Sequence, residues 1–316
     1  MMLTRRQFLQ RTSAFAALFG LTHIHAAQPA PTHFTTLVHG ATFGVPPESP
    51  LLGRLFKATD VRPKPQATAK PLKQLPAESL HPLLGVSEDG WWYQIAEGYL
   101  PRESMQPILP YERPPQPTEL HKGYYEVIAP STTLRSACTP YAITSGRYPF
   151  GSVVYVHDWL TDDHGQVWYA LTLTADGSGT LGWANALHFR RWQPHPSPLN
   201  QPTLWLDAAQ QTLSLYDGET FIGKTAIHAP ILPHGIATLR LGLPSARATR
   251  VPYLHTWQML LSPQHSRPLP LYGVNWHNRF GTPNELRNVE LPILAARQLY
   301  EMLGGAPVRE IAVVIG

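Results

Sequence analysis

The sequence predicts an all-β fold with a single helix close to the C-terminus. The chain carries 33 prolines among 316 residues, and proline breaks long helices because it lacks a backbone N–H and clashes with the preceding turn. Short apolar stretches alternate with turns rich in Gly, Pro, Asn and Asp, which is typical of short strands. Residues 292–303 instead repeat Ile293, Ala296, Tyr300 and Leu303 at near-helical spacing.

The composition indicates a globular chain long enough for two or three small domains. The formal charge of +4 is small, and no dense Lys/Arg run occurs beyond the N-terminus, so we expect no nucleic-acid partner. Because Cys138 is the only cysteine, an internal disulfide and a Cys-rich zinc or iron–sulfur site are excluded. We expect no cofactor and no bound metal.

Residues 1–27 resemble a twin-arginine export signal. Arg5 and Arg6 are followed by Phe8 and by an apolar run over residues 13–21, which is too short and too weakly apolar for a permanent membrane span. The alternative is a cytoplasmic amphipathic helix. The resemblance implies export by the twin-arginine pathway to the periplasm, the cell wall or the extracellular space, with no stable span after signal removal.

Changes in composition divide the rest of the chain. Proline-rich stretches read as linkers, and two stretches repeat the same pattern of short strands and turns. The predicted parts are a tether (28–50), a first β module (51–109), a proline-rich linker (110–121), a second β module (122–191), a second linker (192–202) and a C-terminal domain (203–316).

Both β modules resemble bacterial SH3-like modules, which are small β-barrels. In the first, the matching features are Val61-Arg62, the strand GWWYQI and the closing stretch GYLPRESMQPI; in the second they include the strand at 167–171 and the closing Gly182-Trp183. Such modules bind wall peptides or space a catalytic domain. We expect their aromatic side chains to fill the barrel cores. The alternative is that they form a surface on which a ligand binds.

Two further features have a structural and a functional interpretation. Residues 157–165 gather two histidines and three aspartates; we expect a solvated hairpin loop, and a metal site is the alternative. Cys138 lies early in the second module. We expect an incidental or small buried residue, since a nucleophile would need a paired base.

The C-terminal domain resembles the catalytic domain of the L,D-transpeptidase family. The motifs, in order, are a hairpin around Asp217-Gly218, PHGIATL from Pro233, LPSARAT from Leu243 and YGVNWHNRFGTP from Tyr272. The resemblance covers residues 203–316. It implies a β-sandwich with one helix.

In that family a cysteine thiolate attacks a carbonyl of a peptidoglycan stem peptide, aided by a histidine and by backbone N–H donors. Aligned without gaps from Tyr272, this chain reads ELRNVEL at residues 285–291, where the family has S/T-H-G-C-x-N/R-L. Asn288 takes the position of the cysteine, Tyr272 that of the upstream histidine, Leu286 that of the motif histidine, and Arg287 that of the glycine. We therefore expect no intact catalytic group.

The same segment supplies candidate ligand contacts at Gly273, Trp276, His277 and Arg287. We expect His277 to be a hydrogen-bonded structural residue or a ligand contact, with a general base as the alternative. Arginine suits planar recognition of carboxylates, so Arg287 could contact a stem-peptide carboxylate.

The sequence thus predicts an exported, non-catalytic protein that binds or scaffolds peptidoglycan or its stem peptides. The alternative is an active L,D-transpeptidase whose nucleophile, Cys138 or a hydroxyl, reaches the cleft from elsewhere. An envelope role unrelated to peptidoglycan is also left open.

Overall fold

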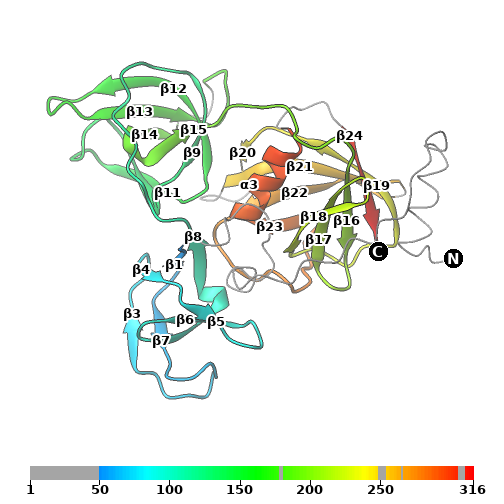
Figure 1. The fold of residues 1–316 in the computed structure, drawn as a ribbon. Helices are drawn as coiled ribbons and strands as arrows, with labels where there is room; N and C mark the ends of the chain where they lie inside the picture. Colours follow the sequence, from blue (N-terminus) through cyan, green and yellow to red (C-terminus); the bar gives the residue numbers. More distant parts are fainter. Residues whose placement is uncertain (1–49, 178–180, 248–253, 265, 305–309) are drawn as a thin grey trace.

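The computed structural model describes residues 50–177, 181–247, 254–264, 266–304 and 310–316 (Figure 1). Strands dominate this part, and the α-helix found in it is α3 (Ile293–Met302). The predicted all-β fold is therefore confirmed. The predicted export signal, and the tether up to residue 49, lie outside the described residues.

Residues 50–109 form three small sheets, with strand orders β4-β1-β8, β2-β3 and β5-β6-β7. The elements are β1 (Leu52–Leu55), β2 (Thr59–Val61), β3 (Lys73–Leu75), β4 (Leu80–Pro82), β5 (Gly85–Val86), β6 (Trp92–Ile95), β7 (Gly98–Pro101), the 3-10 turn η1 (Arg102–Ser104) and β8 (Met105–Ile108).

The aromatic side chains of this module divide between core and surface. Trp92 and Tyr93 are buried, as expected for residues that fill a small barrel. Trp91 is 46% exposed, and its ring lies 4.4 Å from the guanidinium carbon of the buried Arg102. Two of the large aromatics thus serve the core, whereas Trp91 covers a cation.

The second module is one curled sheet of order β11-β10-β14-β13-β12-β9-β15 (Figure 1). Its elements are β9 (Gly123–Val127), β10 (Ser131–Arg135), β11 (Thr144–Pro149), β12 (Val153–Thr161), β13 (Val167–Thr172), β14 (Gly182–Asn185), the 3-10 turn η2 (Ala186–His188) and β15 (Phe189–Arg191). A hydrophobic cluster that includes Tyr125, Tyr169 and Phe189 fills its interior.

The hairpin expected at residues 157–165 is shorter than predicted. Strand β12 continues to Thr161 beyond a bulge at Val156/Asp158, because it stays paired with β13. In the remaining turn the carboxylate of Asp162 accepts the indole N–H of Trp168 and the backbone N–H of His164 and Gln166, at 2.9 Å each. This acidic cluster stabilises a turn.

Nine strands form the C-terminal sheet, in the order β18-β17-β16-β24-β19-β21-β22-β23, with β20 paired to β21. The strands are β16 (Pro202–Asp207), β17 (Thr212–Asp217), β18 (Thr220–Ala226), β19 (Gly235–Leu241), β20 (Ser245–Arg247), β21 (Leu254–Pro263), β22 (Leu269–Val274), β23 (Val289–Pro292) and β24 (Glu310–Ile315). The sheet curls until its two edges meet, because His228, just after β18, forms a backbone bridge with Glu290 of β23.

Helix α3 packs against β21 and β22 and buries Ile293, Ala296 and Leu299. Pro292 precedes its first residue, where a fixed φ favours entry into a helix. The helix ends at Met302, and Gly304 follows in the left-handed region with φ +96°. The second glycine of the predicted stop, Gly305, lies outside the described residues.

The crossover between β22 and β23 joins the C-terminal domain to both modules. Asn278 Nδ2 donates to the hydroxyl of Tyr93 and to the carbonyl of Met105, at 3.0 Å each. Asn275 Nδ2 donates to the carbonyl of Phe150 at 3.2 Å and to Ser152 Oγ at 3.0 Å. A parallel strand pair needs a connection of a dozen or more residues, and here that connection also serves as an interdomain contact.

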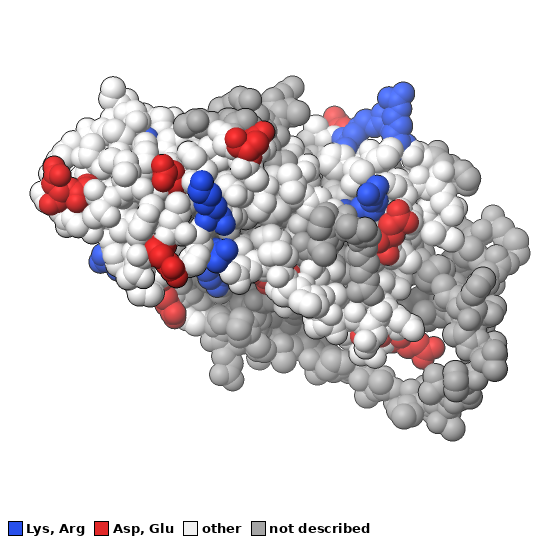
Figure 2. All heavy atoms as spheres, turned by 90° about the horizontal axis from the view of Figure 1, so that it is seen from above, with Lys and Arg blue, Asp and Glu red and all other residues white. Residues whose placement is uncertain are grey.

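Charged side chains on the face seen in Figure 2 are scattered, with Lys and Arg interspersed among Asp and Glu. In the part of the chain that the structure describes, no helix is both long and apolar enough to cross a membrane.

Candidate functional site

The candidate site lies at the seam where the edges of the C-terminal sheet meet. The backbones of His228 and Glu290 exchange two hydrogen bonds of 2.9 Å across this seam. Strands β22 and β23 run parallel, and their register places Tyr272 opposite Glu290. Asn288 comes directly before β23, so three residues of one sequence segment converge on the same place.

Asn288 and Tyr272 are in direct contact. The side-chain amide of Asn288 donates to the hydroxyl of Tyr272, and both residues are buried. The two positions that the sequence alignment assigned to the family's cysteine and upstream histidine are therefore neighbours in space. Burial, and next the charge of Glu290, raises the pKa of Tyr272 to about 12, so its phenol stays protonated at neutral pH.

Glu290 is the centre of the hydrogen-bond network. It is only 3% exposed, and Oε1 accepts from Asn288 Nδ2 at 3.1 Å. Oε2 lies 2.7 Å from His277 Nε2. The charge of this carboxylate also acts on the Tyr272 phenol. A buried carboxylate is tolerated when hydrogen-bond donors surround it, and Glu290 is bonded to the side chains of Asn288 and His277.

His277 has no free ring nitrogen. Nδ1 accepts the backbone N–H of Arg279 at 3.2 Å, so the ring proton lies on Nε2 and is donated to Glu290. A general base needs an unprotonated nitrogen directed at the nucleophile. His277 is therefore a hydrogen-bonded residue within this network.

Two further histidines border the network. His228 Nδ1 donates to the carbonyl of Thr282 at 2.6 Å. The ring of His255 stacks on Tyr272, with the centroids 3.8 Å apart and the planes 12° apart. Burial lowers the pKa of both histidines, which favours their neutral forms at neutral pH.

No nucleophile is paired with a base among the described residues around the seam. The hydroxyl of Thr282 lies 3.3 Å from His228 Nδ1, but that nitrogen carries the proton given to the Thr282 carbonyl. The same hydroxyl donates to the carbonyl of Arg279 at 2.6 Å. Thr282 is thus held in place and is not activated.

Cys138 lies at the far end of the β10–β11 hairpin. The hairpin touches the crossover through Phe150, which directly follows β11. Cys138 is in the loop that precedes Thr144, at the other end of the strand. Six residues in a strand span about 17 Å, so this thiol is remote from the contact with Asn275.

The other predicted contact residues point in different directions. A Cβ on Gly273 would come within 2.7 Å of Ala296, so this glycine faces helix α3 and not the seam. Trp276 is half-buried beside His255 and His277. Arg287 is exposed, and no ion pair holds it within the described ranges.

Leu286 is 57% exposed and lies next to Arg287. Together the two side chains form an apolar and cationic surface beside the network.

Sequence reasoning missed the roles of Glu290, His228 and His255. For Glu290 a signal existed, because a carboxylate between Val289 and Leu291 in an apolar strand needs partners when it is buried. No comparable local pattern marks the histidines, which reach the seam from β21 and from the end of β18.

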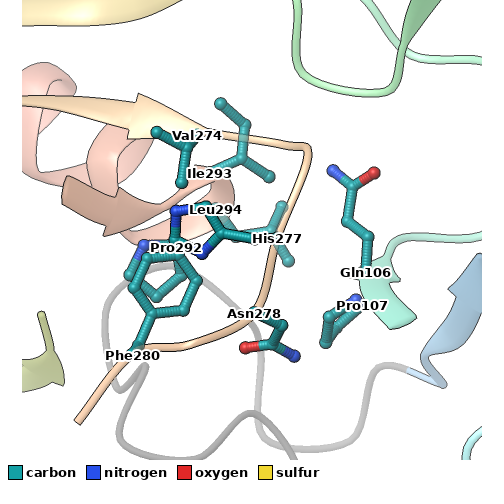
Figure 3. Close-up of a pocket in the computed structure, with 9 residues that line it drawn as sticks. All are labelled: Gln106, Pro107, Val274, His277, Asn278, Phe280, Pro292, Ile293 and Leu294. Carbon is teal, nitrogen blue, oxygen red and sulfur yellow. The ribbon is translucent and has the colours of Figure 1, made fainter. Parts of the chain in front are cut away.

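A small cavity lies behind His277, between the crossover and the first module (Figure 3). Gln106 and Pro107 of β8 line one side, and Phe280, Pro292 and Ile293 lie opposite. Its volume is about 20 Å³, which suffices for one water molecule. A substrate does not fit on this side of the network.

No group of three or more His, Cys, Asp and Glu side chains is arranged to hold a metal ion in the portion of the chain described. The network can orient side chains and fix the crossover. It offers neither a thiol nor a free base.

No protein-family model matches the chain, and no curated protein matches it. Among solved structures, it is similar to an L,D-transpeptidase from Mycobacterium tuberculosis H37Rv, with 15% identity and a TM-score of 0.28, over 52% of this chain and 71% of that one. It is also similar to NlpC2 from Trichomonas vaginalis, with 12% identity and a TM-score of 0.17, over 46% of this chain and 49% of that one. Both likenesses are distant and bear on neither activity nor ligand.

Proposed function

We propose that the chain is an exported cell-wall protein whose C-terminal domain, similar to L,D-transpeptidases, binds peptidoglycan stem peptides without reacting with them. One observation carries the proposal. Asn288 and Tyr272, which stand at the positions of the family's cysteine and upstream histidine, form a closed hydrogen-bonded network with Glu290 and His277.

The network supports a non-catalytic role because its side chains are already hydrogen-bonded and are not available for acyl transfer. The amide nitrogen of Asn288 is delocalised into its carbonyl and donates to Tyr272 and Glu290. The ring nitrogens of His277 are both hydrogen-bonded. A thiolate and a base are required for acyl transfer, and neither is supplied.

Binding is assigned to the exposed surface next to the network. Arg287 offers a guanidinium without an ion pair among the described residues, and Leu286 offers an aliphatic side chain. A stem peptide presents a terminal carboxylate beside small apolar side chains. Guanidinium binds carboxylate with two parallel hydrogen bonds, so the two surfaces are complementary.

The remainder of the chain fits the same role. The N-terminal resemblance to a twin-arginine signal supports export, and the two SH3-like modules support attachment to the wall or spacing from it. These assignments are part of the proposal. They explain why a binding domain would be joined firmly to two further modules through its crossover.

The proposal is tested by co-sedimentation of the chain without residues 1–27 with purified sacculi. We expect saturable binding that Arg287→Ala weakens about tenfold, the effect of losing a hydrogen bond to a charged group worth about 1.5 kcal/mol. Arg240→Ala is the matched control, because Arg240 is also exposed and lies on β19, outside the site. Its binding should match the wild type.

Two outcomes would contradict the proposal. Failure of the wild type to sediment with sacculi would remove the binding role. A stable covalent adduct after carbapenem treatment, detected by intact mass and lost in Cys138→Ala, would instead favour the active L,D-transpeptidase. No observation on the seam favours that second function.

A further inference from the structure

A second, polar hollow lies on the first module. Its volume is about 210 Å³, and it is bounded by the turn between β1 and β2, by β2 and β3, and by η1. Four charged side chains line it: Lys57, Asp60, Arg62 and Glu103. We call this group the charged hollow.

The four charges of the hollow do not pair with one another. No ion pair within 4.0 Å joins the two cations to the two carboxylates among the described residues, although all four line the same space. Lys57 is exposed and has no ion pair in those ranges. The guanidinium of Arg62 donates to the carbonyl of Ala69 and so remains uncompensated by a carboxylate.

The carboxylates are similarly available. Asp60 accepts through one oxygen, from Gln74 Nε2 at 3.3 Å. Glu103 has its ion pair with Arg279 at 3.8 Å, and both side chains are more than half exposed. Exposed pairs at that distance are weak and are screened by salt. A ligand ammonium would meet little competition for either carboxylate.

The charged hollow favours a ligand that carries both a positive and a negative charge. The four groups sum to zero net charge, so a simple anion or a simple cation meets repulsion as well as attraction. The lining has no aromatic ring on which a sugar could stack. Its small apolar residues are Ala58 and Pro101.

We propose that the charged hollow binds a small zwitterion, a free amino acid or a dipeptide with both ends unblocked. The ligand carboxylate pairs with Lys57 or Arg62, and its ammonium pairs with Asp60 or Glu103. This site lies on the first module and does not depend on the role proposed for the C-terminal domain.

The test is a calorimetric or NMR titration of the full chain without residues 1–27. Three probes of similar size are compared: Gly-Gly, N-acetyl-Gly-Gly, which lacks the ammonium, and Gly-Gly amide, which lacks the carboxylate. We expect Gly-Gly to bind about tenfold more tightly than either blocked form, the factor that follows from one lost charged hydrogen bond.

Amino-acid substitutions identify which side chain pairs with the ammonium of the ligand and which pairs with its carboxylate. Asp60→Asn should reduce the preference for Gly-Gly over the acetylated form, and Lys57→Gln the preference over the amide. The controls, Asp163→Asn and Lys70→Gln, change exposed residues outside the hollow and should leave both preferences intact. Unfolding midpoints measured in parallel show whether each variant is folded.

Equal affinity for the three probes, no saturable binding of Gly-Gly, or folded Asp60→Asn/Glu103→Gln and Lys57→Gln/Arg62→Gln double variants that keep both preferences would each overturn the assignment. Binding of Gly-Gly by a chain that fails to sediment with sacculi would support the hollow and contradict the peptidoglycan role. The two proposals are therefore separable.

Discussion

Asn278 donates a hydrogen bond of 3.0 Å to the hydroxyl of Tyr93, which lies 185 residues earlier in the chain. The bond joins the crossover, next to His277, to the core of the first module. Both residues are buried. The position of the candidate site is thus fixed partly by a module outside its own domain.

Asn278→Ala should lower the free energy of unfolding by about 2–3 kcal/mol, because it leaves the Met105 carbonyl without a donor and opens space at a buried contact. Tyr93→Phe should cost about 1 kcal/mol, since Asn278 retains its bond to Met105. Chemical denaturation gives both values. An Asn278→Ala effect below that of Tyr93→Phe would show that the amide does not hold this junction.

Glu290→Gln should destabilise the protein by about 1.5–3 kcal/mol, because the hydrogen bonds from His277 and Asn288 lose their charged acceptor. Glu88→Gln makes the same chemical change at an exposed position and should have an effect within about 0.5 kcal/mol. Denaturant unfolding at pH 7 measures the difference. Equal effects would mean that the network contributes nothing to stability.

Stability should fall as the pH is lowered below 6.5. Burial lowers the pKa of His228 and His255 from 6.5 in the folded chain. The unfolded chain therefore takes up protons first, and each such proton lowers stability by up to about 1.4 kcal/mol per pH unit. Above pH 6.5 these rings are neutral in both the folded and the unfolded chain, so they do not change the free energy of unfolding. Below the pKa values of the folded chain the rings are protonated in both states, and the decrease in stability stops.

His255→Gln should flatten the decrease of unfolding free energy between pH 7 and pH 5, because it removes one of these rings. His195→Gln, which changes an exposed ring, is the control and should leave the slope unchanged. A slope in His255→Gln equal to that of the wild type would contradict the burial argument.

A cysteine introduced at position 288 should be poorly reactive because Glu290 lies beside it. The Asn288 amide is 3.1 Å from the Glu290 carboxylate, and a nearby negative charge disfavours a thiolate. In a Cys138→Ala background, the pH profile of alkylation of Asn288→Cys should shift to lower pH when Glu290→Gln is added. An unchanged alkylation profile in a folded variant would show that the Glu290 carboxylate does not control the reactivity of a thiol at position 288.

Much of the fold follows from local patterns. Proline and glycine mark the turns, the run from Ile293 has helical spacing, and the Asp217-Gly218 turn joins β17 and β18. Such features depend on residues close in sequence. The proximity of Tyr272 and Asn288 depends instead on the parallel pairing of β22 with β23.

The remaining features depend on contacts between distant segments. His255 meets Tyr272 because β21 and β22 are neighbours, and Asn275 meets Phe150 because two domains are packed together. No sequence spacing encodes either contact. The export signal, the module boundaries and the SH3-like identity of the modules stay predictions.

The backbone bridge between His228 and Glu290 also bears on self-association. Strands β18 and β23 end the pairing order of a nine-stranded sheet, and unpaired edges of that kind are templates for strands of other molecules. The bridge occupies part of both edges with their own N–H and C=O groups. Substitutions that open the seam would therefore expose the backbone groups of both edge strands to pairing with other molecules.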